Sequence, residues 1–306
     1  MKLAGHTLGT PDLSLRQALD LFHSLDLEGA EIIWQDGYRC GLAERATPRR
    51  LADVAAMAEA LGLEVVCLVP YTVDINSAVS SSRVLALESF RHCIDAAAAL
   101  DCRRIRVYAG RFLPAEEPLR SAKMEPLMAS LASMRDWAVD AGVTLCVENH
   151  FNTMAVGAGE TAMLLAAVAE RCGDDAGLGA LYDPANLAFT HREPPDEALR
   201  AQNRWVRHVH VKDLVFVEAG HAFAAADVAM VEADARSVRS RVVGEGVLDW
   251  AEIVGGLAAQ GYDGYLSLEY EYRWHPDDLP PPEVGLKRGA NHLRGVLDRA
   301  AGVEQL

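Results

Sequence analysis

The sequence predicts one (β/α)8 barrel, the TIM barrel fold of the α/β class, as a single domain over residues 1–306. Three observations support this prediction. Strand-like segments alternate with helix-like segments eight times, with no break in composition between them. The length suits a barrel of about 250 residues with insertions. No GxGxxG sequence follows the first predicted strand, which disfavours a nucleotide-binding Rossmann sheet.

The elements follow from local patterns. Apolar and β-branched segments predict strands, and helical spacing of apolar residues predicts helices, with Thr47 as an N-cap and Gly62 as a stop. The predicted strands are Lys2–His6, Gly29–Trp34, Leu63–Val69, Arg104–Tyr108, Val143–His150, Leu178–Asp183, Val206–Val211 and Tyr265–Glu269. The predicted helices begin at Asp12 or Ser14 and at Thr47, and then span Ser82–Leu100, Pro118–Ala141, Glu160–Arg171, Asp196–Gln202, Asp249–Ala259 and Leu286–Ala300.

Two connections are much longer than the roughly 2–6 residues usual between a strand and its helix. Residues 214–246 follow the seventh predicted strand, and residues 270–285 follow the eighth. Both are expected at the C-terminal mouth of the barrel, where barrel enzymes place their substrate-binding loops. We expect a lid or a substrate wall there. The alternatives are a contact in a homo-oligomer or a flexible insertion.

The composition excludes several kinds of partner. The 29 Lys and Arg residues against 44 Asp and Glu residues give a formal net charge of −15, which disfavours binding to nucleic acid. No apolar run approaches the ~18 residues of a membrane helix, and the N-terminus lacks the apolar core of a secretion signal. Six scattered cysteines without a CxxC motif indicate reduced thiols, and so a cytoplasmic protein.

Polar side chains mark the C-terminal ends of the fifth to eighth predicted strands. In the fifth strand, alternation directs the valines and leucine toward the helices and Glu148 and His150 toward the barrel interior. The same reasoning places Asp183, His210 and Glu269 at the ends of the next three strands. Crowded carboxylates either take up protons or bind a cation. Three carboxylates and an imidazole favour Mn²⁺, Mg²⁺ or Co²⁺, with Zn²⁺ also compatible. The alternative is a set of separate helix caps and ion pairs.

These residues stand in motifs that resemble the xylose isomerase-like TIM barrel superfamily of sugar phosphate isomerases and epimerases, over the whole chain. The motifs are VENH at Glu148, YDPAN at Asp183, HVHVKD at His210, GEGVLDW at 244–250 and SLEYE at Glu269. The resemblance implies that Glu148, Asp183, His210 and Glu269 hold a divalent metal, with Mn²⁺ as the first expectation.

The resemblance also implies an activity. Family members that isomerise or epimerise ketoses use the two metal-bound glutamates as an acid/base pair on either side of the substrate. Glu148 and Glu269 would then transfer the proton next to the carbonyl of a ketose, keto-sugar or cyclitol through a metal-stabilised enediolate. Two positions depart from the ketose 3-epimerase pattern. Asn186 replaces a substrate-binding histidine and Met154 replaces a glutamate, which disfavours a free-ketose 3-epimerase.

His150 supports a different reaction. It resembles the general base of dehydroshikimate dehydratases and C-glycoside deglycosidases, so a lyase of that type, or a keto-inositol dehydratase, is the main alternative. Otherwise His150 orients a carboxylate. An abasic-site endonuclease is disfavoured, because the third and fourth strands end without the histidines that a three-zinc centre needs. A metal-free binding protein is the remaining option.

Further residues are expected to contact the substrate or to support the site. Lys212 would steady an oxyanion or phosphate, unless it only pairs with Asp213. Arg241 would reach a substrate oxygen. His208, one pleat deeper than His210, is expected to support a ligand or to fill the core rather than to bind the metal. The predicted substrate-binding set is Asn186, His208, Lys212 and Arg241, and the predicted aromatic walls are Trp34, Tyr71, Tyr108 and Trp274.

Overall fold

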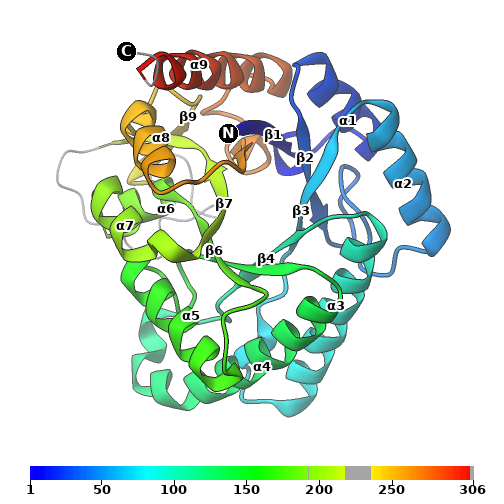
Figure 1. Ribbon diagram of the computed structural model, residues 1–306, viewed down its shortest axis with the longest axis vertical. Coiled ribbons are helices and arrows are strands. Elements are labelled where there is room, and N and C mark those ends of the chain that lie inside the picture. The colour runs from blue at the N-terminus through cyan, green and yellow to red at the C-terminus, as the bar shows by residue number, and fades with distance from the viewer. Residues whose placement is uncertain (192, 218–235, 304–306) are drawn as a thin grey trace.

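A computed structural model describes residues 1–191, 193–217 and 236–303 of the chain. Eight parallel strands close into a barrel surrounded by helices (Figure 1), which confirms the predicted fold. Around the barrel the strands follow the order β1, β10, β7, β6, β5, β4, β3, β2. Across the described ranges, no helix combines the length and the apolar character that crossing a bilayer requires.

Every predicted barrel strand is present, with ends that differ by a few residues at most. The register places inward-facing side chains of neighbouring strands at one level, because Tyr108 pairs with Glu148 and Ser267 pairs with His210. The barrel strands are β1 (Lys2–His6), β2 (Gly29–Trp34), β3 (Glu64–Pro70), β4 (Arg104–Tyr108), β5 (Thr144–Glu148), β6 (Leu178–Tyr182), β7 (Val206–Val211) and β10 (Tyr265–Leu268).

The helices form where the sequence supplies caps. The Ser14 hydroxyl accepts a hydrogen bond from the Gln17 amide, and Thr47 caps the next helix before Pro48. One short helix, α6, was not predicted. The helices are α1 (Leu15–Ser24), α2 (Pro48–Ala60), α3 (Ser80–Ala99), α4 (Arg120–Asp140), α5 (Ala158–Cys172), α6 (Pro184–Thr190), α7 (Pro195–Gln202), α8 (Trp250–Ala259) and α9 (Pro282–Val303).

The main hydrophobic core lies between the barrel and the helices. Leu145 and Val147 on β5 belong to the same buried cluster as Leu131 and Met134 of α4. Glu148, the next residue on the opposite face of the strand, is buried inside the barrel. The alternation predicted for this strand therefore holds. All six cysteines are free thiols, and the cytoplasmic location stays a prediction.

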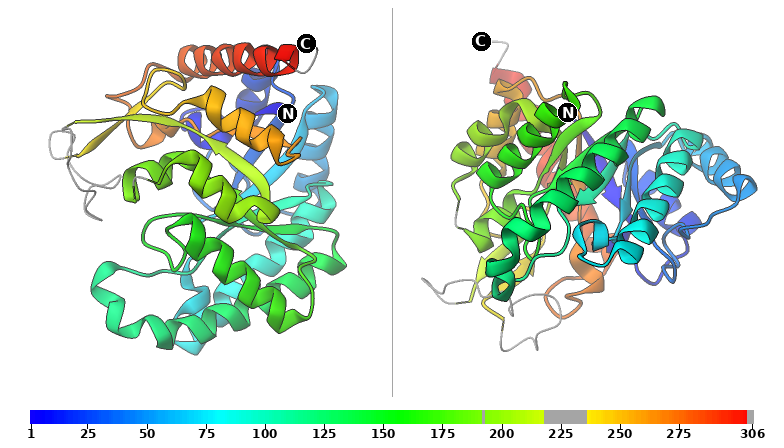
Figure 2. Two further views of the ribbon diagram at one scale, coloured as in Figure 1. Left: turned by 60° about the vertical axis from the view of Figure 1, so that its left-hand side comes forward. Right: turned by 90° about the horizontal axis from the view of Figure 1, so that it is seen from below.

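The described parts of the two long connections contact each other at the barrel mouth. Part of residues 214–246 folds into an antiparallel ribbon of β8 (Asp213–Phe216) and β9 (Val238–Arg241), which extends away from the barrel (Figure 2). The segment 218–235 of this predicted loop lies outside the described residues. Arg236 contacts Asp278 at 2.8 Å and so links the ribbon to the connection after β10. The homo-oligomer contact stays a prediction.

Candidate metal centre and active site

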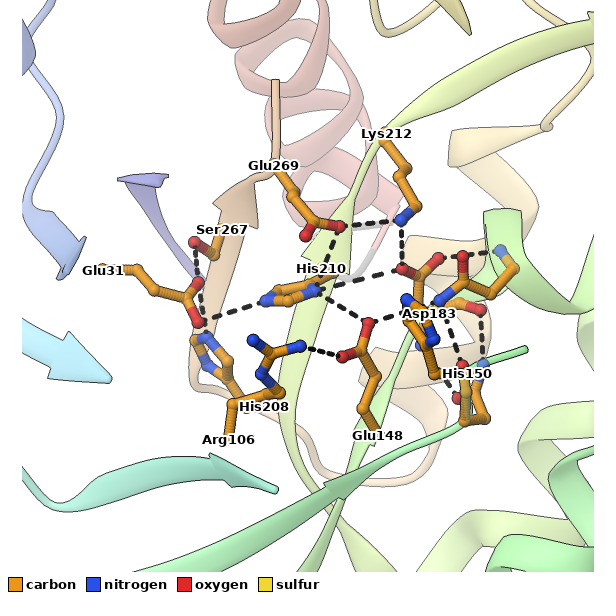
Figure 3. A network of polar contacts seen from close by, with 12 residues as sticks. Glu31, Arg106, Glu148, His150, Asp183, His208, His210, Lys212, Ser267 and Glu269 are labelled. Atoms are coloured by element: carbon orange, nitrogen blue, oxygen red, sulfur yellow. Dashed lines mark hydrogen bonds and ion pairs between the residues drawn. The ribbon is translucent and has the colours of Figure 1, made fainter. Parts of the chain in front are cut away.

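Four side chains converge at the C-terminal mouth of the barrel, as the sequence predicts. Glu148 ends β5, Asp183 follows β6, His210 lies on β7 and Glu269 follows β10 (Figure 3). One ligand atom from each lies within 4.8 Å of the others, and all four residues are buried. The Nδ1 atom of His210 is 3.2 Å from Glu269 Oε2, 3.5 Å from Glu148 Oε1 and 3.9 Å from Asp183 Oδ2.

The donor atoms of this cluster fit a divalent cation. His210 Nδ1 is buried and has no hydrogen-bond partner among the described residues, and Asp183 Oδ2 is buried beside the Lys212 ammonium, 2.9 Å away. Burial raises the pKa of Asp183 to about 6, Lys212 opposes this shift, and the nearby Glu269 and Glu148 carboxylates add to it. A bound cation would relieve this repulsion. Three carboxylates and one imidazole suit Mn²⁺, Mg²⁺ or Co²⁺.

Glu31 on β2 contacts His210 on β7 through the barrel interior, with β1 and β10 lying between the two strands (Figure 3). Its carboxylate is completely buried and accepts hydrogen bonds from His210 Nε2 at 3.1 Å, His208 Nε2 at 3.1 Å and the Ser267 hydroxyl. Because Nε2 of His210 donates to Glu31, Nδ1 is the nitrogen that a cation would use. Burial disfavours the charged ring, but Glu269 and Glu31 raise the pKa of His210 well above its usual value, so a cation would displace a proton from Nδ1. Burial alone would raise the pKa of Glu31, but His210 and His208 hold it well below its usual range.

Arg106 on β4 is a buried cation beside the cluster. Its Nη1 atom donates to Glu148 Oε2 at 3.0 Å, and its Nη2 atom donates to the Pro70 carbonyl at 2.8 Å. The guanidinium lies 3.7 Å from the centroid of the Tyr108 ring, a cation–π arrangement. Burial favours the protonated form of Glu148, but His150, His210 and Arg106 outweigh it and lower the pKa to about 2.

His150 follows β5 and lines the cavity above the cluster. Its Nδ1 atom lies 2.8 Å from the Phe151 carbonyl oxygen. A carbonyl oxygen only accepts hydrogen bonds, so Nδ1 carries a proton, and in the neutral ring Nε2 is the unprotonated nitrogen. Burial lowers the pKa of His150, which keeps the ring neutral near pH 7. The ring packs between Tyr108 and Phe151, at centroid distances of 4.6 and 4.0 Å.

Lys212 reaches into the cluster from the end of β7. Its ammonium lies 2.8 Å from Glu269 Oε2, 2.9 Å from Asp183 Oδ2 and 3.5 Å from Glu271 Oε1. Burial opposes the charged form, but Asp183 and Glu269 raise the pKa of Lys212 well above its usual value. The expected alternative, a local pair with Asp213, does not form. The Asp213 carboxylate instead accepts from the Gly244 and Gly246 amides.

A cavity of about 230 Å³ opens above these residues. The ribbon and the connection after β10 supply part of its lining, as expected for a substrate wall. Of the predicted aromatic residues, Tyr71, Tyr108 and Trp274 line it, whereas Trp34 is buried elsewhere. These three aromatic residues and His150 therefore surround the space in which a ligand of the cluster would sit.

The predicted substrate-binding residues occupy different places. Lys212 lines the cavity. Asn186 is buried beside the cluster and donates to Glu148 Oε1 at 3.3 Å and to the Asn149 carbonyl. His208 is buried against Glu31. Arg241 on β9 lies outside the cavity lining and donates to the Ser240 carbonyl. Substrate contact by these residues stays a prediction, and the geometry favours it for Lys212.

The sequence analysis predicts no role for Glu31 or Arg106, although each has a recognisable feature in the sequence. Glu31 is the single charged residue of GAEIIW, and Arg106 takes an inward position of RIRVY. A charged residue inside an otherwise apolar barrel strand needs a buried partner. Only the closed barrel reveals that these partners are His210 and Glu148.

Comparisons with known proteins place the chain among related barrels. Two curated relatives are the rhizopine catabolism protein MocC of Rhizobium meliloti, 29% identical over 153 residues, and the inosose dehydratase of Geobacillus thermodenitrificans, 27% identical over 161 residues. These matches cover 50% and 53% of this chain, and 44% and 51% of the relatives. The chain thus matches about half the length of each.

Solved structures show the same fold over nearly the whole chain. An L-ribulose 3-epimerase aligns with a TM-score of 0.75 at 18% identity, over 99% of this chain and 97% of its own. A probable 3-DHS dehydratase from Bacillus anthracis aligns with a TM-score of 0.71 at 18% identity, over 96% and 99%. The model of the family described as xylose isomerase-like TIM barrel matches residues 19–296. The chain therefore belongs to the xylose isomerase-like TIM barrel family.

Proposed function

We propose that this chain is a divalent-metal-dependent lyase, which removes the proton next to the carbonyl of a polyhydroxylated ketone and eliminates water. The observation that carries the proposal is the state of His150. Its Nδ1 atom donates to the Phe151 carbonyl and burial favours the neutral ring, so Nε2 of this cavity-lining side chain carries the lone pair. This is the arrangement that a general base requires.

The elimination consists of one proton transfer to His150 and the loss of one hydroxide from the substrate. Nε2 of His150 takes the proton from the carbon next to the carbonyl, and the electron pair of that C–H bond forms a carbon–carbon double bond. The hydroxyl on the following carbon leaves with its bonding electrons. That hydroxide and the removed proton together make one water. A positioned base of this kind contributes roughly 10²–10⁴-fold in rate.

Glu148, Asp183, His210 and Glu269 would hold the cation, which we expect to be Mn²⁺, with Mg²⁺, Co²⁺ or Zn²⁺ as alternatives. When bound, such a cation supplies Lewis-acid stabilisation for negative charge that develops on the carbonyl oxygen. Lys212 borders both the cluster and the cavity as an ammonium. Its positive charge, next to the cluster, would assist the same charge development.

Glu148 is less suited than His150 to accept the proton. Its Oε2 atom accepts a hydrogen bond from Arg106, and its Oε1 atom accepts one from Asn186. Both oxygens are thus engaged before any ligand binds. The inosose dehydratase among the curated relatives and the probable 3-DHS dehydratase among the solved structures are in keeping with an elimination.

An isomerase or epimerase is the second candidate. The observation in its favour is that Glu148 and Glu269 reach the cluster from β5 and β10, which β6 and β7 separate. Two carboxylates that approach from different directions suit a proton removed on one side and returned on the other. The L-ribulose 3-epimerase is a structural neighbour of this kind.

Incubation with candidate ketones in D₂O tests both functions. The Mn²⁺-loaded protein would be given 2-keto-myo-inositol, D-psicose and a 3-keto-glycoside, with products analysed by NMR and mass spectrometry. A lyase gives a product that has lost one water. An epimerase gives a product of unchanged composition with deuterium at one carbon. If none of these ketones gives either product or exchanges deuterium, both candidate functions are contradicted.

A further inference from the structure

The cavity above the metal-binding cluster has two different walls. Aromatic rings form one wall, where Tyr108 and Phe151 flank His150 and Phe189 lies 5.8 Å from Phe151 between ring centroids. Charged and polar side chains from β7, the ribbon and the 3-10 helix η7 (Glu271–Arg273) form the other. The charged wall decides what the cavity accepts, because desolvating a charge is far more costly than desolvating an aromatic face.

Lys212 is the cation of the charged wall that lies nearest the cluster. Three carboxylates, those of Asp183, Glu269 and Glu271, lie within 3.5 Å of its ammonium. The ammonium has three N–H donors, and the surrounding carboxylates can occupy all of them. An anionic group on a ligand would therefore compete with three carboxylates for one positive charge.

The positive charges of Arg236 and Arg106 are likewise paired with carboxylates of the protein. Arg236 Nη1 lies 2.8 Å from Asp278 Oδ2 and 2.6 Å from His275 Nδ1, and the Asp278 side chain is almost completely buried. Arg106 is bound to Glu148 and to the Pro70 carbonyl. Each of these cations thus already faces a carboxylate of the protein.

Glu271 adds a negative charge at the open side of the cavity. Its side chain is 25% exposed, and its Oε2 atom accepts a hydrogen bond from the Ser240 hydroxyl at 3.0 Å. With Glu148, Asp183 and Glu269 it makes four carboxylates around Lys212 and Arg106. One divalent cation would offset the remaining two negative charges and would leave the group without a net positive charge to attract an anionic ligand.

We propose that this cavity selects uncharged polyhydroxylated ketones over phosphorylated or carboxylated ones, and that Glu271 is the specificity-determining residue. The inference rests on the proposed function only in taking the cavity as the substrate site. The Glu271 carboxylate can accept hydrogen bonds from the hydroxyl groups of a ligand, and the Ser240 hydroxyl can donate to them or accept from them. The aromatic wall packs against the apolar C–H face of the same molecule. A phosphate or carboxylate instead meets the Glu271 carboxylate as a like charge.

Direct binding to the Mn²⁺-loaded protein tests this selection. D-psicose is compared with D-psicose 6-phosphate, and 2-keto-myo-inositol with 3-dehydroshikimate, by calorimetry. The uncharged member of each pair is expected to bind at least about tenfold more tightly. This difference in affinity should become smaller as the NaCl concentration rises from about 0.01 M to about 1 M, because the electrostatic screening length falls from about 30 Å to about 3 Å. Glu271→Gln should also reduce the difference in affinity. Glu283→Gln, at the exposed start of α9, is the matched control and should leave the difference unchanged.

Equal or tighter binding of the phosphorylated or carboxylated member would overturn the proposed selection. A difference in affinity that neither salt nor Glu271→Gln reduces would also overturn it. The outcome for the proposed function is separate. If the uncharged ketone binds with the expected preference but shows no deuterium exchange in D₂O, the proposed reaction fails and the charge selection stands. The salt series needs no variant, so the test does not depend on how any substitution folds.

Discussion

Glu31 and His210 meet across the barrel, with a carboxylate oxygen of Glu31 3.1 Å from Nε2 of His210. The two residues are 179 positions apart in the sequence and come from β2 and β7. This contact fixes which nitrogen of His210 faces Glu148, Asp183 and Glu269. The affinity of the cluster for a cation would therefore depend on a residue that does not itself belong to it.

Glu31→Gln should weaken Mn²⁺ binding by about 10–100-fold, because the neutral amide no longer polarises His210. Ser267→Ala is the matched control. It removes one hydrogen bond to Glu31 but leaves the contact between Glu31 and His210 intact. Calorimetric titration of both apo-proteins with Mn²⁺ measures the effect. Equal affinities for the wild type and Glu31→Gln would show that Glu31 does not position His210.

Asp183→Asn should reduce the thermal stabilisation that Mn²⁺ provides, while leaving the fold intact. Asp183 has two tasks, since Oδ1 accepts from the Asn186 amide at the start of α6 and Oδ2 faces the cluster. Asparagine keeps an oxygen for the cap but loses the ligand charge. For the wild type, Mn²⁺ at 100 times Kd should add about 2.7 kcal/mol to the free energy of unfolding. An unchanged Mn²⁺-dependent Tm shift in Asp183→Asn would exclude Asp183 as a ligand.

Arg106→Met should lower the free energy of unfolding by about 3–5 kcal/mol, because it leaves the buried Glu148 carboxylate without its partner. Adding Glu148→Gln should recover part of this loss, since the double variant no longer buries an unpaired charge. Urea unfolding of the two single variants and the double variant gives the coupling between the residues. Strictly additive changes would show that the ion pair does not stabilise the barrel.

His275 should make the link between the ribbon and the connection after β10 sensitive to pH. Burial lowers the pKa of His275 below its usual 6.5, so the folded state favours the neutral ring, whose Nδ1 accepts from Arg236. Glu271 and Asp278 oppose this shift, and Arg236 and Lys212 add to it. The stability from the contact is therefore present at pH 7 and lost as the pH falls below 6.5.

Hydrogen exchange, corrected for intrinsic rates, measures this effect. The segments 237–241 and 271–278 should lose protection at acid pH relative to pH 7. His275→Gln, which retains an acceptor but cannot titrate, should reduce the difference. The same loss of protection in His275→Gln and in the wild type would exclude His275 as the cause.

The sequence was sufficient to predict the barrel and the four cluster residues because both follow from short patterns. Alternation within β5 and β7 places Glu148 and His210 on the inner face, and parallel strands bring their C-terminal ends together. It was not sufficient for Glu31 and Arg106, whose roles depend on which side chains meet across the closed barrel. No local pattern determines that contact.

The mouth of the barrel was the least predictable region. The ribbon consists of two four-residue strands, and β9, with the sequence VRSR, lacks the apolar alternation that usually indicates a strand. The ribbon brings Ser240 to the cavity, and substrate contact by Arg241, which lies outside the cavity lining, stays a prediction. The short helix α6 has only seven residues and depends on the Asp183 cap. A segment of this length is too short to show a clear helical pattern in the sequence.

Comparison of the wild type with His150→Asn tests the proposed reaction most directly. Asparagine can keep a donor for the Phe151 carbonyl but has no counterpart of Nε2. With an uncharged ketone in D₂O and saturating Mn²⁺, the rate of α-proton removal should fall by roughly 10²–10⁴-fold. The affinity for Mn²⁺ should stay within about threefold, since His150 is not a ligand of the cluster. Proton removal at the wild-type rate in His150→Asn would contradict the assignment of His150 as the base.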